Sequence, residues 1–268
     1  VFGDWSSDVC SSDLPGGRRA EGAGPSARAQ ARPRAGFAAV SVAIGAPPGP
    51  AVASLYYGEK AVASQELSVM EREFRSETIR LDPALSSLRA DPDPEKDRQA
   101  LEYLELLARI EPSAAFLDGA FIRPVPAGNR RTSFFGDKRL YSYSNGSKAS
   151  SVHAGIDYGY PVGTAVVAAG RGRVVMAQDR IVTGLTIVLE HLPGVYSIYM
   201  HLSRMDVSPG AVVGRGSPIG AIGSTGLATG PHLHWELRVL GQAADPEALI
   251  GIDKIPEIRT ITAAIEGR

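Results

Sequence analysis

The stretch Gly230-Pro231-His232-Leu233-His234-Trp235-Glu236 decides the fold expected for the C-terminal half of this chain. Side chains at positions i and i+2 of an extended strand point to the same face. His232 and His234 are therefore expected to aim their imidazoles into one volume, while Leu233 and Trp235 turn towards a core. The stretch predicts a half-buried β-strand that carries two histidines on its polar face.

An earlier cluster, His153-Ala154-Gly155-Ile156-Asp157, supplies a third histidine and a carboxylate. The i, i+4 spacing also fits one face of a helix. However, the glycine at position 155 and the alternation of Ile156, Tyr158 and Val162 favour an extended segment. Two imidazoles and one carboxylate are the ligands of a zinc ion that keeps one position open for water. Neither the thiolates of an iron–sulfur site nor the carboxylate cage of a calcium site accompanies them, so the two clusters together predict a zinc site.

The wider set of motifs resembles the signature of the lysostaphin/LytM family of zinc endopeptidases. Its three parts occur in the order His153-x-x-x-Asp157, Tyr199-Met200-His201 and Gly230 to Glu236. Flanking stretches also match: Thr132-Ser133-Phe134-Phe135-Gly136, Gly163-Thr164-Ala165-Val166 and Gly220-x-x-Gly223-Ser224-Thr225-Gly226. The resemblance runs from about Arg130 to about Ile250, which is a little under half of the chain. Members of this family cut the peptide cross-links of bacterial peptidoglycan.

The resemblance implies a role for each polar residue of the motifs. His153, Asp157 and His234 are expected to hold Zn²⁺, with water in the fourth position. His232 is expected to act as the general base, and His201 to stabilise the oxyanion or to orient the water. For His201 the alternative is a strand-end histidine that only caps a sheet edge.

Other candidates near these motifs are less specific. Some relatives use a tyrosine shortly before the first ligand, but here that stretch reads Ser147-Lys148-Ala149-Ser150, so the role is absent or passes to Tyr143. Some relatives add an asparagine as a fourth ligand in a self-blocked state, and Asn129 and Asn145 are the candidates here. His191, in the predicted turn Glu190-His191-Leu192-Pro193-Gly194, matches no ligand position and is expected at the surface.

These residues predict a zinc-dependent endopeptidase that hydrolyses cross-links or stem peptides of bacterial peptidoglycan, with metal-activated water as the nucleophile. One alternative is a non-catalytic module of the same fold that binds the cell wall or activates another hydrolase. A second alternative is a peptidase of non-wall peptides. The complete set of ligands and neighbouring histidines favours catalysis. The substrate implies the cell envelope, either periplasmic or secreted, and the sequence identifies no regulatory partner.

The composition excludes several other classes of function. The 28 basic and 29 acidic residues nearly balance, which indicates neither nucleic-acid binding nor a polybasic membrane patch. No apolar run reaches the roughly 18 residues that span a bilayer. The glycines before the His-x-His stretch precede a strand rather than a helix, which disfavours a phosphate-binding loop. Cys10 is the only cysteine, so no intrachain disulfide can form.

The chain is expected to contain several consecutive parts. The stretch Asp4 to Leu14 resembles a translated sequencing adaptor, so the true amino terminus is expected to be missing. Asp93-Pro94-Glu95 predicts the start of a helix that extends to about Glu111, with Leu101, Leu104 and Ala108 facing the core. The predicted parts are an artefact or disordered segment (1–35), the remnant of an N-terminal β accessory module (36–82), a helical connector (83–122), the zinc metallopeptidase domain (123–252) and a tail (253–268).

The expected fold class is mainly β. Short strands at regular spacing, separated by Gly, Pro or Asp turns, predict an antiparallel sheet in the peptidase domain. The resemblance adds that the zinc lies in a groove on this sheet. Before it, alternating apolar positions predict a truncated module that is similar to the end of a β-sandwich. The predicted strands of the peptidase domain are 166–169, 172–178, 185–191, 196–202, 212–216, 219–222 and 232–239.

Overall fold

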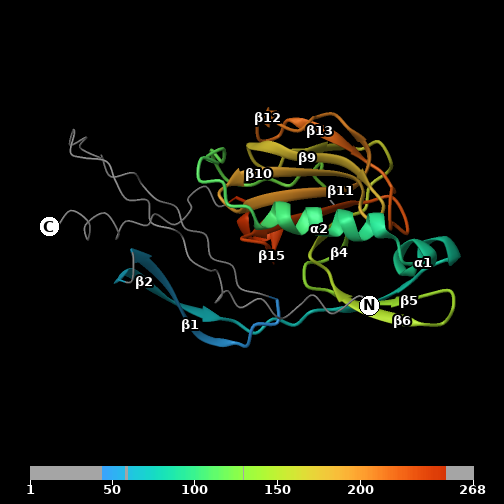
Figure 1. Ribbon diagram of the computed structural model, residues 1–268, viewed down its shortest axis with the longest axis horizontal. Coiled ribbons are helices and arrows are strands. Elements are labelled where there is room, and N and C mark those ends of the chain that lie inside the picture. The colour runs from blue at the N-terminus through green and yellow to red at the C-terminus, as the bar shows by residue number, and fades with distance from the viewer. Residues whose placement is uncertain (1–43, 58–59, 129, 252–268) are drawn as a thin grey trace.

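A ten-stranded antiparallel sheet dominates the computed structural model, which describes residues 44–57, 60–128 and 130–251 (Figure 1). The strand order is β12-β9-β10-β11-β14-β7-β4, with β13 paired to β11 and β8, and β15 paired to β14. The predicted mainly β fold is confirmed. The strands are β4 (Arg131–Ser133), β7 (Gly155–Tyr158), β8 (Ala165–Val167), β9 (Gly172–Arg180), β10 (Gly184–Leu192), β11 (Val195–Met205), β12 (Val212–Val213), β13 (Pro218–Ile222), β14 (Leu233–Val239) and β15 (Gln242–Ala244).

Strand β14 divides its side chains between two environments. Leu233, Trp235 and Leu237 belong to the main apolar core, and the first two are completely buried. The Trp235 ring stacks on Tyr158 of the neighbouring strand β7, with ring centroids 6.4 Å apart. The alternate positions of β14 therefore face away from this core, as the period of a strand requires.

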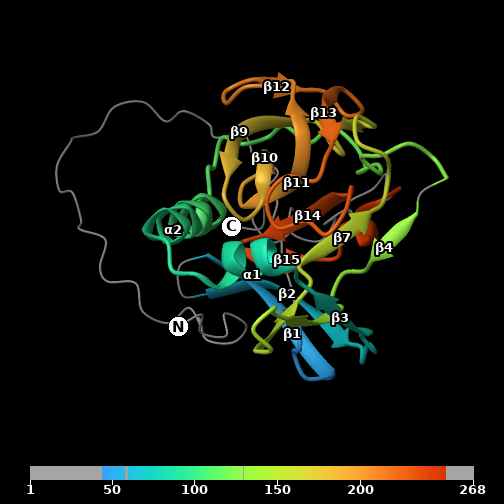
Figure 2. The same ribbon diagram turned by 90° about the vertical axis from the view of Figure 1, so that its right-hand side faces the viewer.

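Helix α2 (Pro94–Ala108) covers part of this second face (Figures 1 and 2). It begins as predicted: the Asp93 side chain accepts a hydrogen bond from the Glu95 backbone N–H. Its Leu106 and Leu107 pack against Ile198 and Met200 of β11 in a second apolar cluster. Ile198 and Met200 lie directly opposite Glu236 and His234 in the antiparallel pairing with β14. Helix α2 therefore lies on the same face of the sheet as the His-x-His histidines.

The predicted buried stripe of α2 was wrong. Leu101 is 58% exposed and Leu104 is 45% exposed. The helix is rotated by polar contacts that its apolar spacing does not reveal. The Gln99 side chain accepts a hydrogen bond from the Ile181 backbone N–H, and the Gln99 carbonyl accepts one from Arg180. These contacts turn Leu106 and Leu107, rather than Leu101 and Leu104, towards the sheet.

The N-terminal part contains two small sheets and a short helix. Strands β1 (Gly49–Tyr57) and β2 (Lys60–Val69) pair antiparallel. Strand β3 (Ser76–Arg80) pairs in parallel with β5 (Lys138–Ser142), and β5 pairs antiparallel with β6 (Lys148–Val152). Helix α1 (Pro83–Ala90) lies at the start of the predicted helical connector (83–122), and a 3₁₀ turn, η1 (Pro246–Leu249), follows β15.

The predicted domain boundaries stay a prediction. Strand β3 lies within the predicted accessory module (36–82), yet it pairs with β5 of the predicted peptidase domain (123–252). The predictions for residues 1–35, for residues 253–268 and for Asn129 fall outside the described part of the chain. Within that part, no helix is both long enough and apolar enough to cross a membrane.

His191 was expected at the surface and is instead fully buried at the end of β10. Its Nδ1 lies 2.8 Å from the Arg171 carbonyl oxygen, and its Nε2 lies 2.7 Å from the Ser197 hydroxyl. Phe121 packs edge-on against the ring. The predicted turn begins after His191, which places this histidine inside the strand. Burial lowers the pKa of His191 from 6.5 to about 4.

This buried histidine predicts acid sensitivity of the fold. Between about pH 6.5 and 4 the unfolded chain protonates His191 while the folded protein keeps it neutral, so the free energy of unfolding falls as the pH falls. The expected loss from this residue is about 3 kcal/mol, and it is absent above about pH 6.5. Chemical denaturation at several pH values should show a shallower pH dependence for His191→Asn than for the wild type. Equal slopes in the two proteins would contradict the assignment.

Candidate metal centre

The three predicted ligands come together because strands β7 and β14 are neighbours in the sheet. His234 of β14 lies directly opposite Asp157 of β7 in the antiparallel register, so their side chains share one face. His153 stands just before β7, where its backbone N–H donates to the Asp137 carbonyl. All three side chains are buried, with relative exposures of 2% for His153, 5% for Asp157 and 7% for His234.

One atom of each residue points to a common centre. His153 Nε2 lies 2.9 Å from His234 Nδ1 and 3.1 Å from Asp157 Oδ1. His234 Nδ1 lies 2.8 Å from the same carboxylate oxygen. A tetrahedral ion with ligand bonds of about 2.0–2.1 Å separates its ligand atoms by roughly 3.3 Å, so the observed triangle needs only slight expansion to hold zinc.

The protonation states also favour a cation at this centre. His153 Nδ1 lies 2.8 Å from the Phe134 carbonyl oxygen, and His234 Nε2 lies 2.8 Å from Glu236 Oε1. Both partners are acceptors, so each of these ring nitrogens carries the proton. The two nitrogens that face each other are then unprotonated, and Asp157 adds a third acceptor. Three converging lone pairs require a positive charge between them.

The charges around the centre support the same conclusion. Burial disfavours the charged form of His234, but Asp157 and Glu236 outweigh it and raise its pKa to about 9. Burial also opposes ionisation of Asp157, yet its contacts with the imidazoles of His153 and His234 hold its pKa well below the usual range. The carboxylate is therefore ionised at neutral pH. In the absence of a metal, a proton supplies the positive charge, and metal binding would displace it.

Two further histidines stand beside the triangle. The ring centroids of His201 and His232 lie 4.8 Å apart, and that of His201 lies 6.2 Å from that of His234. His232 Nε2 lies 3.9 Å from Asp157 Oδ1. All five predicted site residues thus lie in one cluster. His201 comes from β11, and His232 and His234 come from the start of β14. Asp157 comes from β7 and His153 from the residues just before it.

The comparisons with known proteins agree with this geometry. Residues 151–246 match the model of peptidase family M23. The chain belongs to peptidase family M23. The chain is 40% identical over 127 residues to the peptidoglycan DD-endopeptidase ShyA of Vibrio cholerae, a match that covers 47% of this chain and 29% of ShyA. It is 42% identical over 95 residues to the DD-carboxypeptidase/endopeptidase Mpg of Neisseria meningitidis. That match covers 35% of this chain and 22% of Mpg.

A solved structure resembles more of the chain. The crystal structure of a Pseudomonas aeruginosa protein assigned to peptidase M23 superposes with a TM-score of 0.59 at 26% identity. That match covers 79% of this chain and 78% of the other, so it includes elements outside the segment that matches the family model. By contrast, the chain spans less than a third of the length of the curated relatives ShyA and Mpg.

His201 of this M23 family member adopts an unusual backbone conformation. Its φ is +61°, in the left-handed region that residues other than glycine rarely occupy. The conformation is held by hydrogen bonds from the His201 backbone N–H to the Thr183 carbonyl and from Nδ1 to the Thr225 carbonyl. Burial, followed by repulsion from His232 and His234, lowers the pKa of His201 to about 3. Backbone strain at a buried polar residue is typical of functional sites.

The side of His234 that faces away from the centre is bound to a polar network. Glu236 Oε2 accepts hydrogen bonds from Arg238 Nε at 2.7 Å and from the Tyr103 hydroxyl of α2 at 3.3 Å. His234, Glu236 and Arg238 alternate along β14 and so share its polar face. This network was not predicted from the sequence, although the same period of two that paired His232 with His234 extends to Glu236 and Arg238. For Tyr103, no sequence pattern indicated a contact with this strand.

Glu236 predicts a measurable effect on metal affinity. The Glu236→Gln variant removes the charge that fixes the Nε2 proton of His234, so zinc affinity is expected to fall about tenfold to a hundredfold. Competition with a chromophoric chelator measures this change. Glu190→Gln is a matched control, because Glu190 is a buried carboxylate of the same sheet that pairs with Arg173 and lies outside the metal cluster. Equal zinc affinities for the wild type and Glu236→Gln would contradict the role.

Two other predicted candidates have different partners. The Tyr143 hydroxyl accepts a hydrogen bond from Arg89 Nε of α1. Asn145 lies in the turn between β5 and β6, where its side chain accepts hydrogen bonds from the backbone N–H and the hydroxyl of Ser147. The contacts of both residues are thus made outside the metal cluster.

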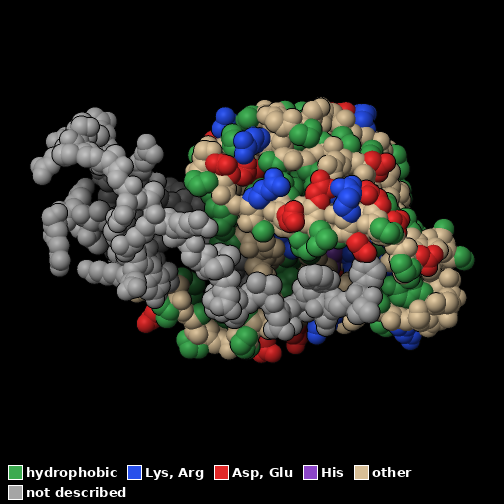
Figure 3. All heavy atoms as spheres, in the orientation of Figure 1, with side chains coloured by type: hydrophobic (Ala, Val, Ile, Leu, Met, Phe, Trp, Pro, Cys, Tyr) green, Lys and Arg blue, Asp and Glu red, His purple; other side chains and the backbone are tan. Residues whose placement is uncertain are grey.

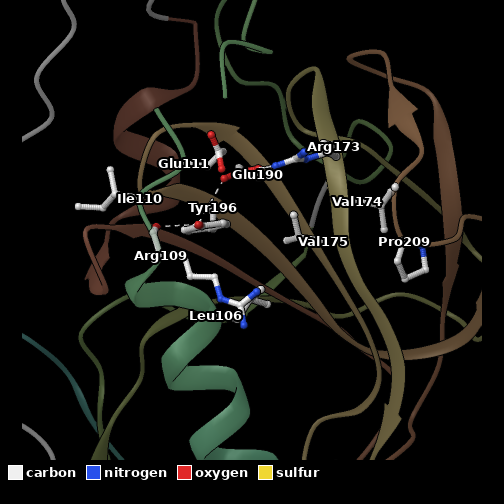
Figure 4. A pocket seen from close by; sticks show the side chains of 11 residues that line it. Leu106, Arg109, Ile110, Glu111, Arg173, Val174, Val175, Glu190, Tyr196 and Pro209 are labelled. Atoms are coloured by element: carbon white, nitrogen blue, oxygen red, sulfur yellow. Dashed lines mark hydrogen bonds and ion pairs between the residues drawn. The ribbon is translucent and has the colours of Figure 1, made fainter. Parts of the chain in front are cut away.

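Cavities of similar size lie at two places outside the metal triangle. One, of about 510 Å³, lies past the C-terminal end of the helix and contains the satisfied ion pair of Arg173 with Glu190 (Figure 4). The other, also about 510 Å³, is lined by residues that include Leu88 of α1, Ile181 and Thr225. Because the Thr225 carbonyl bonds to His201, this second cavity adjoins the cluster of histidines. On the face in Figure 3, acidic and basic side chains of the described residues are interspersed.

Proposed function

We propose that this chain is a zinc-dependent endopeptidase that hydrolyses peptide cross-links of bacterial peptidoglycan. The observation that carries the proposal is the convergence of three acceptor atoms, from His153, Asp157 and His234, beside the two imidazoles of His201 and His232. Two nitrogens and one carboxylate oxygen are the donor set of a zinc ion with an open position. The names of the relatives ShyA and Mpg support a DD-endopeptidase, which acts on bonds between D-configured centres.

The proposed ligands are His153 Nε2, His234 Nδ1 and Asp157 Oδ1. When bound, zinc supplies Lewis acidity, which lowers the pKa of a coordinated water and polarises the scissile carbonyl. The hydrogen bonds from His153 to Phe134 and from His234 to Glu236 fix the protons on the outer ring nitrogens and turn the other nitrogen of each imidazole towards the metal position.

We assign proton transfer to His232. Its Nδ1 lies 2.8 Å from the Gly230 carbonyl oxygen and so carries a proton, which leaves Nε2 free to accept one. That Nε2 lies towards the ligand cluster, 3.9 Å from Asp157 Oδ1. His232 can therefore take the proton of the attacking water at Nε2 and deliver it to the amine that leaves.

For His201 we propose that it orients the water. Its Nδ1 proton is committed to the Thr225 carbonyl, so Nε2 is an acceptor and its depressed pKa keeps it neutral. A neutral imidazole with an acceptor nitrogen can receive a hydrogen bond from water but cannot donate one to an oxyanion from that atom. This argument favours the second of the two roles that were predicted for His201, the orientation of the water.

Substrate chemistry places the protein in the cell envelope, and we propose a periplasmic or secreted location. The substrate is the peptide portion of peptidoglycan. The cavity beside Thr225 and Ile181 offers room for peptide residues on one side of the scissile bond. We propose no regulatory partner.

Incubation of the zinc-loaded protein with cross-linked peptidoglycan tests this function. Mass spectrometry of the released muropeptides should show cross-linked dimers converted to monomers, with a free terminus at the cleaved bond. A free peptide of matched composition, supplied in parallel, separates wall cleavage from general peptidase activity. Zinc-loaded protein that leaves the dimers intact while it stimulates another hydrolase would instead indicate a non-catalytic module of the same fold.

A further inference from the structure

A buried arginine binds the second carboxylate oxygen of the proposed ligand Asp157. Arg139 Nη2 lies 2.5 Å from Asp157 Oδ2, whereas Oδ1 faces His153 and His234. The Arg139 side chain is only 14% exposed, and that of Asp157 only 7% exposed. The two oxygens of this carboxylate are thus divided between the metal centre and a guanidinium group.

A carboxylate from the N-terminal part holds the arginine in place. Glu77 of β3 lies directly beside Arg139 of β5 in the parallel pairing, and Arg139 Nε donates to Glu77 Oε1 at 2.7 Å. The same oxygen accepts a hydrogen bond of 2.9 Å from the Ser133 hydroxyl. Ser133 Oγ lies 3.2 Å from His153 Nδ1. Through Arg139 and Ser133, Glu77 therefore reaches two of the three proposed ligands.

We propose that Arg139 and Glu77 are positioning residues of the metal centre. Arg139 binds Oδ2 of Asp157, so that only Oδ1 of the carboxylate can bind the metal. Glu77 fixes the orientation of Arg139. This proposal rests on the ligand set His153, Asp157 and His234 given above. Both positioning residues precede residues 151–246, the segment that matches the family model, so β3 and β5 extend the metal centre beyond that segment.

Charge balance explains why both residues are needed. An isolated guanidinium close to the site would repel a divalent cation, whereas a guanidinium paired with Glu77 donates its hydrogen bonds without adding net charge. The planar fork of Arg139 contacts both carboxylates at once, through Nη2 and Nε. A lysine has a single ammonium group and cannot reproduce this bridge.

Two measurements on this chain test the proposal: zinc affinity by chelator competition, and the visible spectrum of the cobalt(II)-substituted protein. Arg139→Gln and Glu77→Gln are each expected to weaken zinc binding about tenfold or more. The release of Oδ2 in Arg139→Gln should let Asp157 bind through both oxygens, and the higher coordination number should weaken the cobalt absorption bands. Arg139→Lys should fall between the wild type and Arg139→Gln. Glu77 acts through Arg139. The loss of zinc-binding free energy in the double variant should therefore not exceed the sum of the losses in the two single variants.

Lys138→Gln and Glu73→Gln are matched controls, since both are exposed neighbours of the tested residues and should leave both measurements unchanged. Circular dichroism checks that each variant folds. If Arg139→Gln fails to fold, Arg139→Lys and Glu77→Gln still decide the question. Wild-type zinc affinity and an unchanged cobalt spectrum in these two variants would overturn the proposal. A wild-type protein that binds no zinc would instead refute the proposed function.

Discussion

The His234→Ala variant is expected to lose tight zinc binding and to hydrolyse cross-linked peptidoglycan at least roughly a thousandfold more slowly than the wild type. The substitution removes one of the three converging acceptors and leaves Glu236 without its histidine partner. Zinc supplies several kcal/mol of transition-state stabilisation, and each 1.4 kcal/mol corresponds to about a tenfold change in rate. Metal analysis after dialysis and the rate of dimer cleavage measure the two effects.

His191→Ala provides a matched control for this variant. His191 is also a buried histidine of the same sheet, but its partners are Arg171 and Ser197 rather than the metal cluster. It should be less stable than the wild type, yet it should retain zinc and activity at temperatures where it stays folded. If His234→Ala kept one tightly bound zinc and the wild-type rate, the proposed ligand set would be wrong.

The His232→Ala variant is expected to keep its zinc while the cleavage rate falls by about a hundredfold to ten-thousandfold, the usual contribution of a general base. His232 is not one of the three converging ligands, and its Nε2 lies 3.9 Å from Asp157 Oδ1.

Steady-state kinetics and metal analysis check this prediction. The loss should appear in kcat, since His232 acts on the proton of the attacking water rather than on substrate binding. A variant that retains zinc and the wild-type kcat would move the role of base to another residue. His201 would then be the next candidate.

The central strand of the site could be predicted because its chemistry and its core packing follow one simple period. Leu233 and Trp235 alternate with His232 and His234, and the structure places the first pair in the apolar core and the second beside Asp157. The same period of two also places Glu236 on the face of His234, but its role beside His234 was not predicted. A regular local pattern therefore carries much of the information about this site.

Contacts between distant segments could not be predicted in the same way. The pairing of Glu77 with Arg139 depends on a parallel register between β3 and β5, which no local pattern encodes. The rotation of α2 depends on Gln99, whose partners Arg180 and Ile181 lie far along the chain. His191 looked like a turn residue because a proline and a glycine follow it closely, but the strand continues through it.

Crystallographic diffraction measured at the zinc absorption edge tests the central claim most directly. The zinc-loaded protein should show one anomalous peak within bonding distance of His153 Nε2, His234 Nδ1 and Asp157 Oδ1, at about 2.0–2.2 Å from each atom. Asp157 Oδ2 should remain on Arg139. A tightly bound zinc whose anomalous peak lies away from these three atoms, in protein that cleaves peptidoglycan, would contradict the account.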